Sequence, residues 1–162
     1  MSEGAFMART PQWIKKLGGF AGELYVAAEL TKRGVCVALL PENFPDDDLM
    51  IASKDGSKTG YIQVKACHPQ RSSTFILHDT DEKWAASGKN KDRERFVVFV
   101  DLGNPSRNES PSYWIATRGE VGNACISHPA HGTNNWERRF SKDALNSKGW
   151  KDRWSLFEQF LP

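Results

Sequence analysis

The stretch GYIQVKACHP, residues 60–69, decides how the rest of the sequence is interpreted. Its first half is rich in apolar residues, as is typical of a short β-strand. Gln63 and Lys65 are two residues apart in it, so we expect their side chains on one face of that strand. An amide and an ammonium group side by side indicate either a solvated face or one half of an active site.

Two further strands are expected upstream of this one. The run VCVALL, residues 35–40, is apolar and partly β-branched, and the run DLMIAS, residues 48–53, is similar. The turn KDGSKTG, residues 54–60, predicts that the second run forms a hairpin with the quoted stretch. The segment PENFPDDD, residues 41–48, has two prolines and a run of acids, so it predicts a loop.

A long helix is expected to precede these strands, over residues 11–32, with Gly34 as its stop. Glu23 borders its predicted packing face, where a carboxylate is costly unless it is paired, hydrated or bound to a cation. Side chains at three- and four-residue spacing define the face that we expect to pack on the sheet, namely Phe20, Leu24, Ala27, Ala28 and Thr31.

The second half continues the alternation of helices and strands. Short strands are expected at residues 74–77 and 113–117, and a short helix at residues 80–87. The run RFVVFVDL, residues 95–102, is apolar enough for burial on both faces and so for an interior strand. Thr117 and Glu120 resemble a capping box that opens a brief helix, and short helical pieces follow from residue 135. The order predicts one α/β domain, residues 1–162, built around a mixed sheet.

Four polar side chains are expected to meet at one end of this sheet. Asp48 stands directly before the second strand, beside the face of the third strand that carries Gln63 and Lys65. Glu23 leans over them from the helix. Two carboxylates and an amide oxygen suit a hard cation such as Mg²⁺. A lysine next to such a cation can help orient or deprotonate an attacking water and offset the negative charge that builds on a phosphorus centre.

The segments GELYVAAELTKRG, PDDDLMI and YIQVK, residues 22–34, 45–51 and 61–65, resemble the PD-(D/E)XK nuclease superfamily, in particular its Holliday-junction-resolvase-like and Mrr-like members. The resemblance implies a restriction-endonuclease-like αβββαβ core, with a central mixed β-sheet flanked by helices. It also implies an endonuclease that hydrolyses phosphodiester bonds with a divalent metal, Mg²⁺ or Mn²⁺, and we expect DNA as its substrate.

The resemblance also implies the roles of the site residues. The metal ligands would be Glu23, Asp48, Gln63 and the backbone carbonyl of Val64, and Lys65 would assist the attacking water. Many members have glutamate where this chain has Gln63, so the predicted site carries one negative charge fewer. In the neighbouring loop, residues 46 and 47 are either further ligands or ordinary loop acids; Asp48 is favoured because it abuts the strand.

Composition limits the class of protein without choosing a function. The chain has 162 residues, 39% hydrophobic and 26% charged, as is typical of a soluble globular protein. It has no apolar run long enough to span a membrane and no secretory signal pattern. Three widely spaced cysteines argue against a disulfide framework and favour a reducing compartment, so the cytoplasm is the expected location.

A net charge of +2 permits nucleic-acid binding without requiring it. Basic residues gather in two places, after residue 88 and near the C-terminus, where aromatic residues lie between them. They form either a solvated face with its aromatics in the core, or a groove for phosphates. On the second interpretation the nucleic-acid-binding residues are Lys89, Lys91, Arg93, Arg138 and Arg139.

Two functions therefore follow from the sequence. One is a metal-dependent nuclease; the alternative is a catalytically inactive module of the same fold that binds nucleic acid or a protein partner. The motif residues favour the nuclease. Because the sequence shows no sequence-reading domain, structure-selective binding, a partner subunit or a homodimer is the expected means of choosing a substrate.

Overall fold

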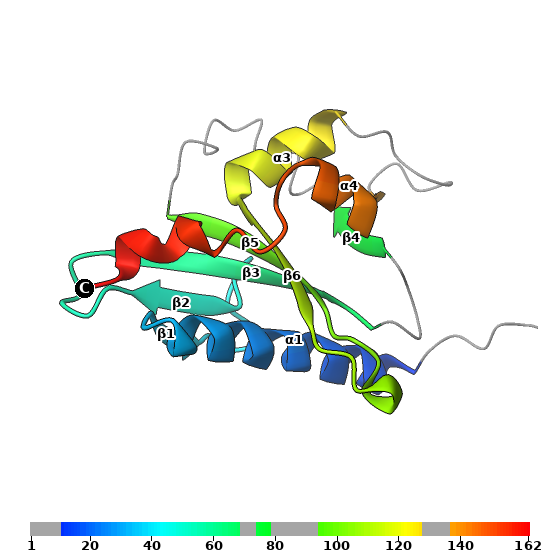
Figure 1. Ribbon diagram of the computed structural model, residues 1–162, viewed down its shortest axis with the longest axis horizontal. Coiled ribbons are helices and arrows are strands. Elements are labelled where there is room, and N and C mark those ends of the chain that lie inside the picture. Colours follow the sequence, from blue (N-terminus) through cyan, green and yellow to red (C-terminus); the bar gives the residue numbers. More distant parts are fainter. Residues whose placement is uncertain (1–10, 69–73, 79–93, 128–136) are drawn as a thin grey trace, which may run out of the picture.

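The computed structural model describes residues 11–68, 74–78, 94–127 and 137–162. A five-stranded mixed sheet in the order β1-β2-β3-β5-β6 forms its centre (Figure 1). Strands β3 and β5 are parallel, and the other neighbours are antiparallel. The bounds are α1 (Gln12–Lys32), β1 (Cys36–Leu39), β2 (Leu49–Ala52), β3 (Thr59–Cys67), β5 (Arg95–Asp101) and β6 (Ser112–Thr117).

The sheet lies between two layers (Figure 1). Helix α1 covers one face, and α3 (Arg118–Ser127) and α4 (Lys142–Ser147) lie over the other. A separate two-stranded sheet pairs β4 (Thr74–His78) with β7 (Glu137–Ser141). Two 3₁₀ helices complete the described chain, η2 (Pro105–Arg107) and η3 (Trp154–Phe160).

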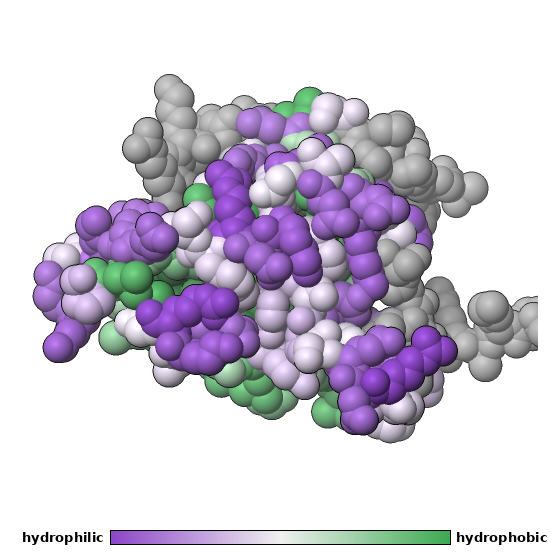
Figure 2. Space-filling view, in the orientation of Figure 1, coloured by the Kyte–Doolittle hydropathy of each residue, from purple (hydrophilic) through white to green (hydrophobic). Residues whose placement is uncertain are grey.

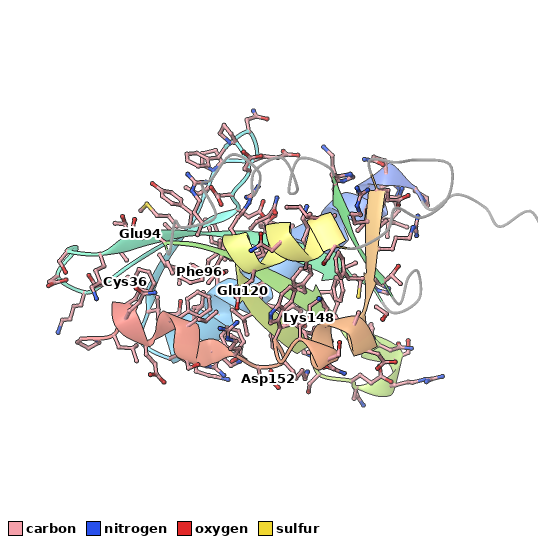
Figure 3. The ribbon with its side chains drawn as sticks, turned by 90° about the horizontal axis from the view of Figure 1, so that it is seen from above. Cys36, Glu94, Phe96, Glu120, Lys148 and Asp152 are labelled. Atoms are coloured by element: carbon pink, nitrogen blue, oxygen red, sulfur yellow. The ribbon has the colours of Figure 1, made fainter. Side chains whose placement is uncertain are left out.

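Most predicted elements are confirmed, including the long helix, the antiparallel β2–β3 hairpin and the strands at residues 95–101 and 112–117. The capping box is also confirmed, because the backbone N–H of Thr117 donates to the Glu120 carboxylate and the backbone N–H of Glu120 donates to the Thr117 hydroxyl. Figure 3 shows Glu120 at the start of α3. The helix predicted for residues 80–87 lies outside the described residues. After residue 135 the prediction of helical pieces alone was wrong, since β7 forms there.

The predicted packing face of α1 was wrong except for Ala27, which packs against the core. Gly22, Val26 and Leu30 are the buried residues of this helix, whereas Phe20 and Leu24 are 51% and 45% exposed. The helix carries two apolar stripes, and spacing alone does not tell which one meets the sheet. The choice depends on Gly22, because only a residue without a side chain lets the helix approach β3 this closely. A Cβ atom at Gly22 would lie 2.7 Å from the Cβ of Ala66.

This close approach gives a test with a matched control. Gly22→Ala is expected to lower the free energy of unfolding by about 1–3 kcal/mol, because the added methyl group forces α1 away from the strand. Gly19→Ala, in the same helix, meets nothing within 4 Å and is expected to raise it by up to about 1 kcal/mol. Chemical denaturation of both variants measures the difference, and equal effects would contradict this account of the helix.

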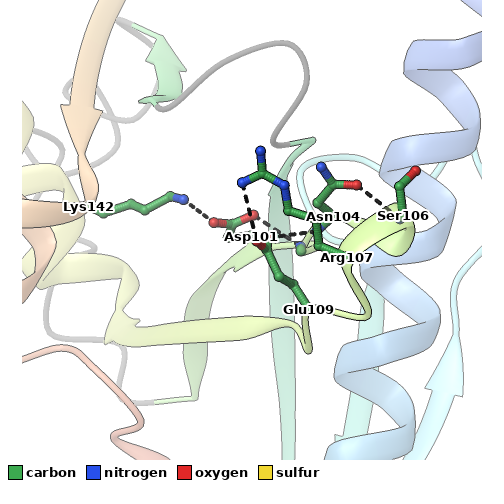
Figure 4. Close-up of polar contacts among 7 residues, drawn as sticks. Asp101, Asn104, Ser106, Arg107, Glu109 and Lys142 are labelled. Carbon is green, nitrogen blue, oxygen red and sulfur yellow. Dashed lines mark hydrogen bonds and ion pairs between the residues drawn. The ribbon is translucent and has the colours of Figure 1, made fainter.

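Strand β5 supplies the core on both faces of the sheet, as its apolar run predicts. Phe96 and Val98 pack with α1 and η3, and Val97 and Phe99 pack with α3, α4 and β4. At the end of β5 the Asp101 carboxylate forms an ion pair with Lys142 of α4 and accepts the backbone N–H of Gly103 at 3.1 Å (Figure 4). These contacts join the second layer to the sheet.

Candidate active site beside the first residue of β2

The site is built where β2 begins. The ladder between β2 and β3 has Leu49 opposite Ile62 as its first pair. Just before it, the backbone N–H of Asp48 donates to the Ile62 carbonyl at 2.9 Å, and the Asp48 carboxylate accepts the backbone N–H of Val64 at 2.7 Å. The carboxylate therefore takes the place that a further strand residue would occupy along the edge of β3.

This bond also orients the carbonyl of Val64. In an antiparallel ladder the N–H and C=O of one residue point to the same neighbouring strand. Because the Val64 N–H points to Asp48, the Val64 C=O faces the same edge. An aspartate oxygen and a backbone oxygen are thus placed side by side at the start of β2.

Gln63 and Lys65 share the face of β3 that is turned away from α1, as their spacing predicts. Their partners in β5 are Val97 and Phe99, which belong to the core on the α3 side. The Oε1 atom of Gln63 is buried and has no hydrogen-bond partner among the described residues. A buried amide oxygen without a donor costs free energy, and a cation would relieve that cost.

Glu23 and Asp48 line one cleft of about 510 Å³ between α1 and the β1–β2 loop, which we call the acidic cleft. Burial, followed by the charges of Asp48 and Glu42, raises the pKa of Glu23 above its usual value of 4.5. Burial also raises the pKa of Asp48, against the lowering effects of the Val64 N–H and of Lys65. The cleft thus concentrates negative charge that the protein neutralises only in part.

A second cleft of about 410 Å³ adjoins this point on the other side of Val64, and we call it the basic cleft. Lys15, Lys65, His68 and Arg139 line it, together with apolar and hydroxyl groups, and its described lining includes no carboxylate. Asp48 of the acidic cleft accepts the hydrogen bond from Val64 of the basic cleft, so this bond lies between the two clefts. A surface lined with carboxylates and a surface lined with basic groups are therefore adjacent.

The three consecutive aspartates have different surroundings. Asp46 adopts a left-handed conformation, with φ of 67°, and its carbonyl accepts a hydrogen bond from Arg118 at 3.3 Å. Asp47 is buried, and its carboxylate lies 2.6 Å from the guanidinium of Arg95. Only Asp48 lines either cleft. The sequence favoured Asp48 as the site residue, but the roles of Arg95 and Arg118 were not predicted. The run of three aspartates was the available signal, because acidic residues packed against a strand need basic partners elsewhere in the chain.

The predicted nucleic-acid-binding residues fall into three groups. Lys89, Lys91 and Arg93 lie outside the described residues. Arg138 lies in β7, where its Nε atom donates to the Cys125 carbonyl at 3.3 Å and so anchors the strand to α3. Arg139 lines the basic cleft with Lys65. The C-terminal aromatics Phe140 and Trp150 are buried in the core. This is what the interpretation as a solvated basic face predicted for them.

The raised pKa of Glu23 predicts the direction of a stability change. A raised folded pKa means that the folded state binds the proton more tightly, so ionised Glu23 lowers the free energy of unfolding as pH rises above about 4.5. In metal-free buffer at neutral pH, Glu23→Gln is therefore expected to raise Tm by about 1–3 °C. The gain should vanish below pH 4.5. Thermal melts at both pH values check this, and a lower Tm at neutral pH would contradict it.

Two kinds of feature are absent from the described residues. Among the described residues, no three histidine, cysteine, aspartate or glutamate side chains are grouped so that they could hold a metal ion. Any cation here would depend on the oxygens of Gln63 and Val64 as well. In the same part of the chain, no helix has the length and apolarity to cross a membrane.

No family model and no curated protein matches this chain. It is similar to the structure of Hjc, a Holliday junction resolvase from Archaeoglobus fulgidus, an archaeal hyperthermophile, with 12% identity over 80% of this chain and 88% of that one and a TM-score of 0.48. It is also similar to the bacterial homing endonuclease I-Ssp6803I, with 16% identity over 90% of this chain and 92% of that one and a TM-score of 0.52. The second likeness shows that the chain has the restriction-endonuclease-like fold.

Proposed function

We propose that this protein is a divalent-metal-dependent nuclease that hydrolyses phosphodiester bonds in DNA. The observation that carries the proposal is the position of the two clefts on either side of the hydrogen bond between Asp48 and Val64. A phosphodiester is an anion that needs both a cation on its oxygens and positive side chains along its path. The acidic cleft would hold the first, and the basic cleft supplies the second.

Four groups would hold Mg²⁺ or Mn²⁺. They are the carboxylates of Glu23 and Asp48, the Oε1 atom of Gln63 and the carbonyl of Val64. The lone buried Gln63 oxygen and the raised pKa of both carboxylates fit a cation at this place. Two carboxylates and neutral oxygens are the donor set that Mg²⁺ uses when it shares its shell with water and substrate phosphate. When bound, the metal supplies a polarised phosphoryl oxygen and a more acidic water.

The chain's own residues would perform the remaining tasks. Lys65 stands next to Val64 on the same strand and lines the basic cleft, so its ammonium group can hold the scissile phosphate and stabilise the negative charge that develops on it. Lys15 and Arg139 approach the cleft from α1 and β7, and they would bind neighbouring phosphates of the same strand. Asp48 accepts the Val64 N–H and is thereby fixed in orientation.

The proposal is tested by incubating the purified protein with supercoiled, linear and branched DNA in Mg²⁺, in Mn²⁺ and in excess EDTA. We expect cleavage with a metal and none with the chelator. Asp48→Asn, prepared in parallel, is expected to be inactive, which would separate the protein's activity from a contaminant. Cleavage in EDTA, or equal cleavage by the variant, would refute the proposed site.

A second candidate is a nucleic-acid-binding module without catalysis. Gln63 favours it, because a neutral ligand leaves the site with one charge fewer for a metal. Such a module would bind DNA through Lys15, Lys65 and Arg139 without cutting it. Binding that is lost on replacing these residues, with no cleavage of any substrate in either metal, would establish this alternative.

A further inference from the structure

Helix α1 has a second apolar stripe, which faces away from the sheet. Its members are large side chains that remain about half exposed or more: Trp13 at 63%, Leu17 at 58%, Phe20 at 51% and Leu24 at 45%. At about 100° per residue this stripe lies opposite the buried face formed by residues 22, 26 and 30. Figure 2 shows hydrophobic residues along the edge of the molecule where Figure 1 places α1. Exposed apolar surface of this continuity marks an interaction site.

The spacing of the stripe indicates what covers it. Successive members are four, three and four residues apart, which is the spacing of the a and d positions in a coiled-coil seam. The seam extends about 17 Å along the helix axis. We propose that α1 is the interface between two copies of this chain, with the two α1 helices packed antiparallel across a two-fold axis.

Charge next to the seam favours the antiparallel direction. Lys16 and Glu23 flank the stripe on the same side, seven residues apart. In an antiparallel pair these two positions face each other, so Lys16 of one copy lies opposite Glu23 of the other, whereas a parallel pair would place them opposite Ala21 and Ala28 and pair no charges. The centre of the pair falls at Gly18 and Gly19. Leu17 and Phe20 flank this centre, so Leu17 of one copy packs on Phe20 of the other.

Charge also argues against nucleic acid as the occupant. Leu17 and Phe20 form one wall of the acidic cleft, together with Glu23, Glu42 and Asp48. Phosphates laid along the stripe would meet these carboxylates, whereas the basic cleft lies on the other side of Val64. An apolar surface with acidic neighbours fits a protein helix better than a phosphate backbone.

The size of the surface fits a modest dimer. Large side chains offer about 150–250 Å² each, so the exposed parts of the stripe amount to on the order of 400 Å² per copy. The pair would bury about 800 Å², which is less than the roughly 1,000 Å² of a stable specific interface and is in the range of a weak, transient one. We therefore expect association that depends on protein concentration, without a permanent dimer at high dilution.

The arrangement has a consequence for the nuclease, and this consequence alone rests on the proposed function. Both acidic cleft walls lie on the same side of the helix pair, and the two Glu23 residues are about 13 Å apart along the helix axes. Two metal sites on one side of a symmetric dimer can act on the two strands of one DNA molecule. The dimer itself is tested without reference to cleavage.

The test is sedimentation velocity on the full chain between about 1 and 100 µM. We expect a monomer–dimer equilibrium for the wild type and a monomer throughout for Leu17→Glu. Ile126→Glu is the matched control, because Ile126 is 53% exposed and lies on α3, away from the stripe; it should dimerise like the wild type. Circular dichroism melts confirm that each variant is folded.

The orientation is tested by exchanging charge. Lys16→Glu is expected to weaken the dimer, and Lys16→Glu combined with Glu23→Lys is expected to restore it. A wild type that stays monomeric at 100 µM, or a dimer that survives Leu17→Glu, would overturn the proposal. If the wild type is a monomer and Leu17→Glu weakens DNA binding, the stripe contacts nucleic acid and the proposal is equally overturned.

Discussion

Replacing Lys65 by alanine is expected to reduce the rate of DNA cleavage by about 10²–10⁴-fold. Lys65 lines the basic cleft, and its charge lowers the pKa of Asp48, so its ammonium group acts close to the bond that lies between the two clefts. No other lysine or arginine of β3 adjoins this point. Without Lys65, the charge that develops on the phosphate loses a cation that is already held in place by the strand.

Lys58→Ala is the matched control for this prediction. Lys58 carries the same charge in the β2–β3 turn and lines a surface hollow with Lys54 and the C-terminal residues, away from both clefts. Its variant should cleave like the wild type. Single-turnover rates in saturating Mg²⁺ separate loss of chemistry from loss of binding. Full activity of Lys65→Ala would show that the cleavage site lies elsewhere.

Replacing Arg95 by alanine is expected to lower the free energy of unfolding by about 3 kcal/mol. The side chain of Asp47 is fully buried, with its Oδ2 atom 2.6 Å from the Arg95 guanidinium. Burial raises the pKa of Asp47, and the charges of Arg95 and then Arg118 oppose this rise. Removing Arg95 leaves the carboxylate buried with only part of its compensating charge. Arg95 also lies over the ring of Tyr61, so some packing is lost as well.

A double-mutant cycle isolates the ionic part of this loss. Asp47→Asn in the Arg95→Ala background removes the uncompensated charge, so it should restore about 1–3 kcal/mol. The exposed ion pair between Arg107 and Glu109, 4.0 Å apart, is the control, and Arg107→Ala should cost less than about 1 kcal/mol. Equal costs for the buried and the exposed pair would contradict the role assigned to Arg95.

The ion pair between Arg95 and Asp47 also helps to hold Asp48 in place. Arg95 fixes Asp47 from β5, and Arg118 fixes the carbonyl of Asp46 from α3, so the two residues before Asp48 are anchored to separate elements. Asp48 then extends from a fixed loop to the N–H of Val64. Asp48 is thereby held between two anchored residues and the edge of β3.

Features that depend on nearby residues could be predicted from the sequence. The β2–β3 hairpin follows from two apolar runs joined by a glycine-containing turn, and its register brings Asp48 beside Val64. The shared face of Gln63 and Lys65 follows from the two-residue period of a strand. The capping box of Thr117 and Glu120 could be predicted in the same way, from their three-residue spacing.

Features that depend on residues far apart in the chain could not be predicted from the sequence. The partner of Asp47 is Arg95, 48 positions away, and no local pattern joins them. Arg139 reaches the basic cleft because β7 pairs with β4, a pairing between short segments of weak apolar character. The two faces of α1 could not be told apart, because the stripe through Phe20 and Leu24 is as regular as the buried one through Gly22.

Anomalous scattering from crystals grown with Mn²⁺ would show whether a cation binds between Asp48 and Val64, because it locates the metal independently of catalysis. We expect a peak within about 2.5 Å of an Asp48 carboxylate oxygen and the Val64 carbonyl oxygen, with Glu23 and the Oε1 atom of Gln63 around it. The peak should be absent from crystals of Asp48→Asn. The absence of a peak at saturating Mn²⁺, or a peak only elsewhere on the chain, would contradict the proposed metal site at Asp48 and Val64.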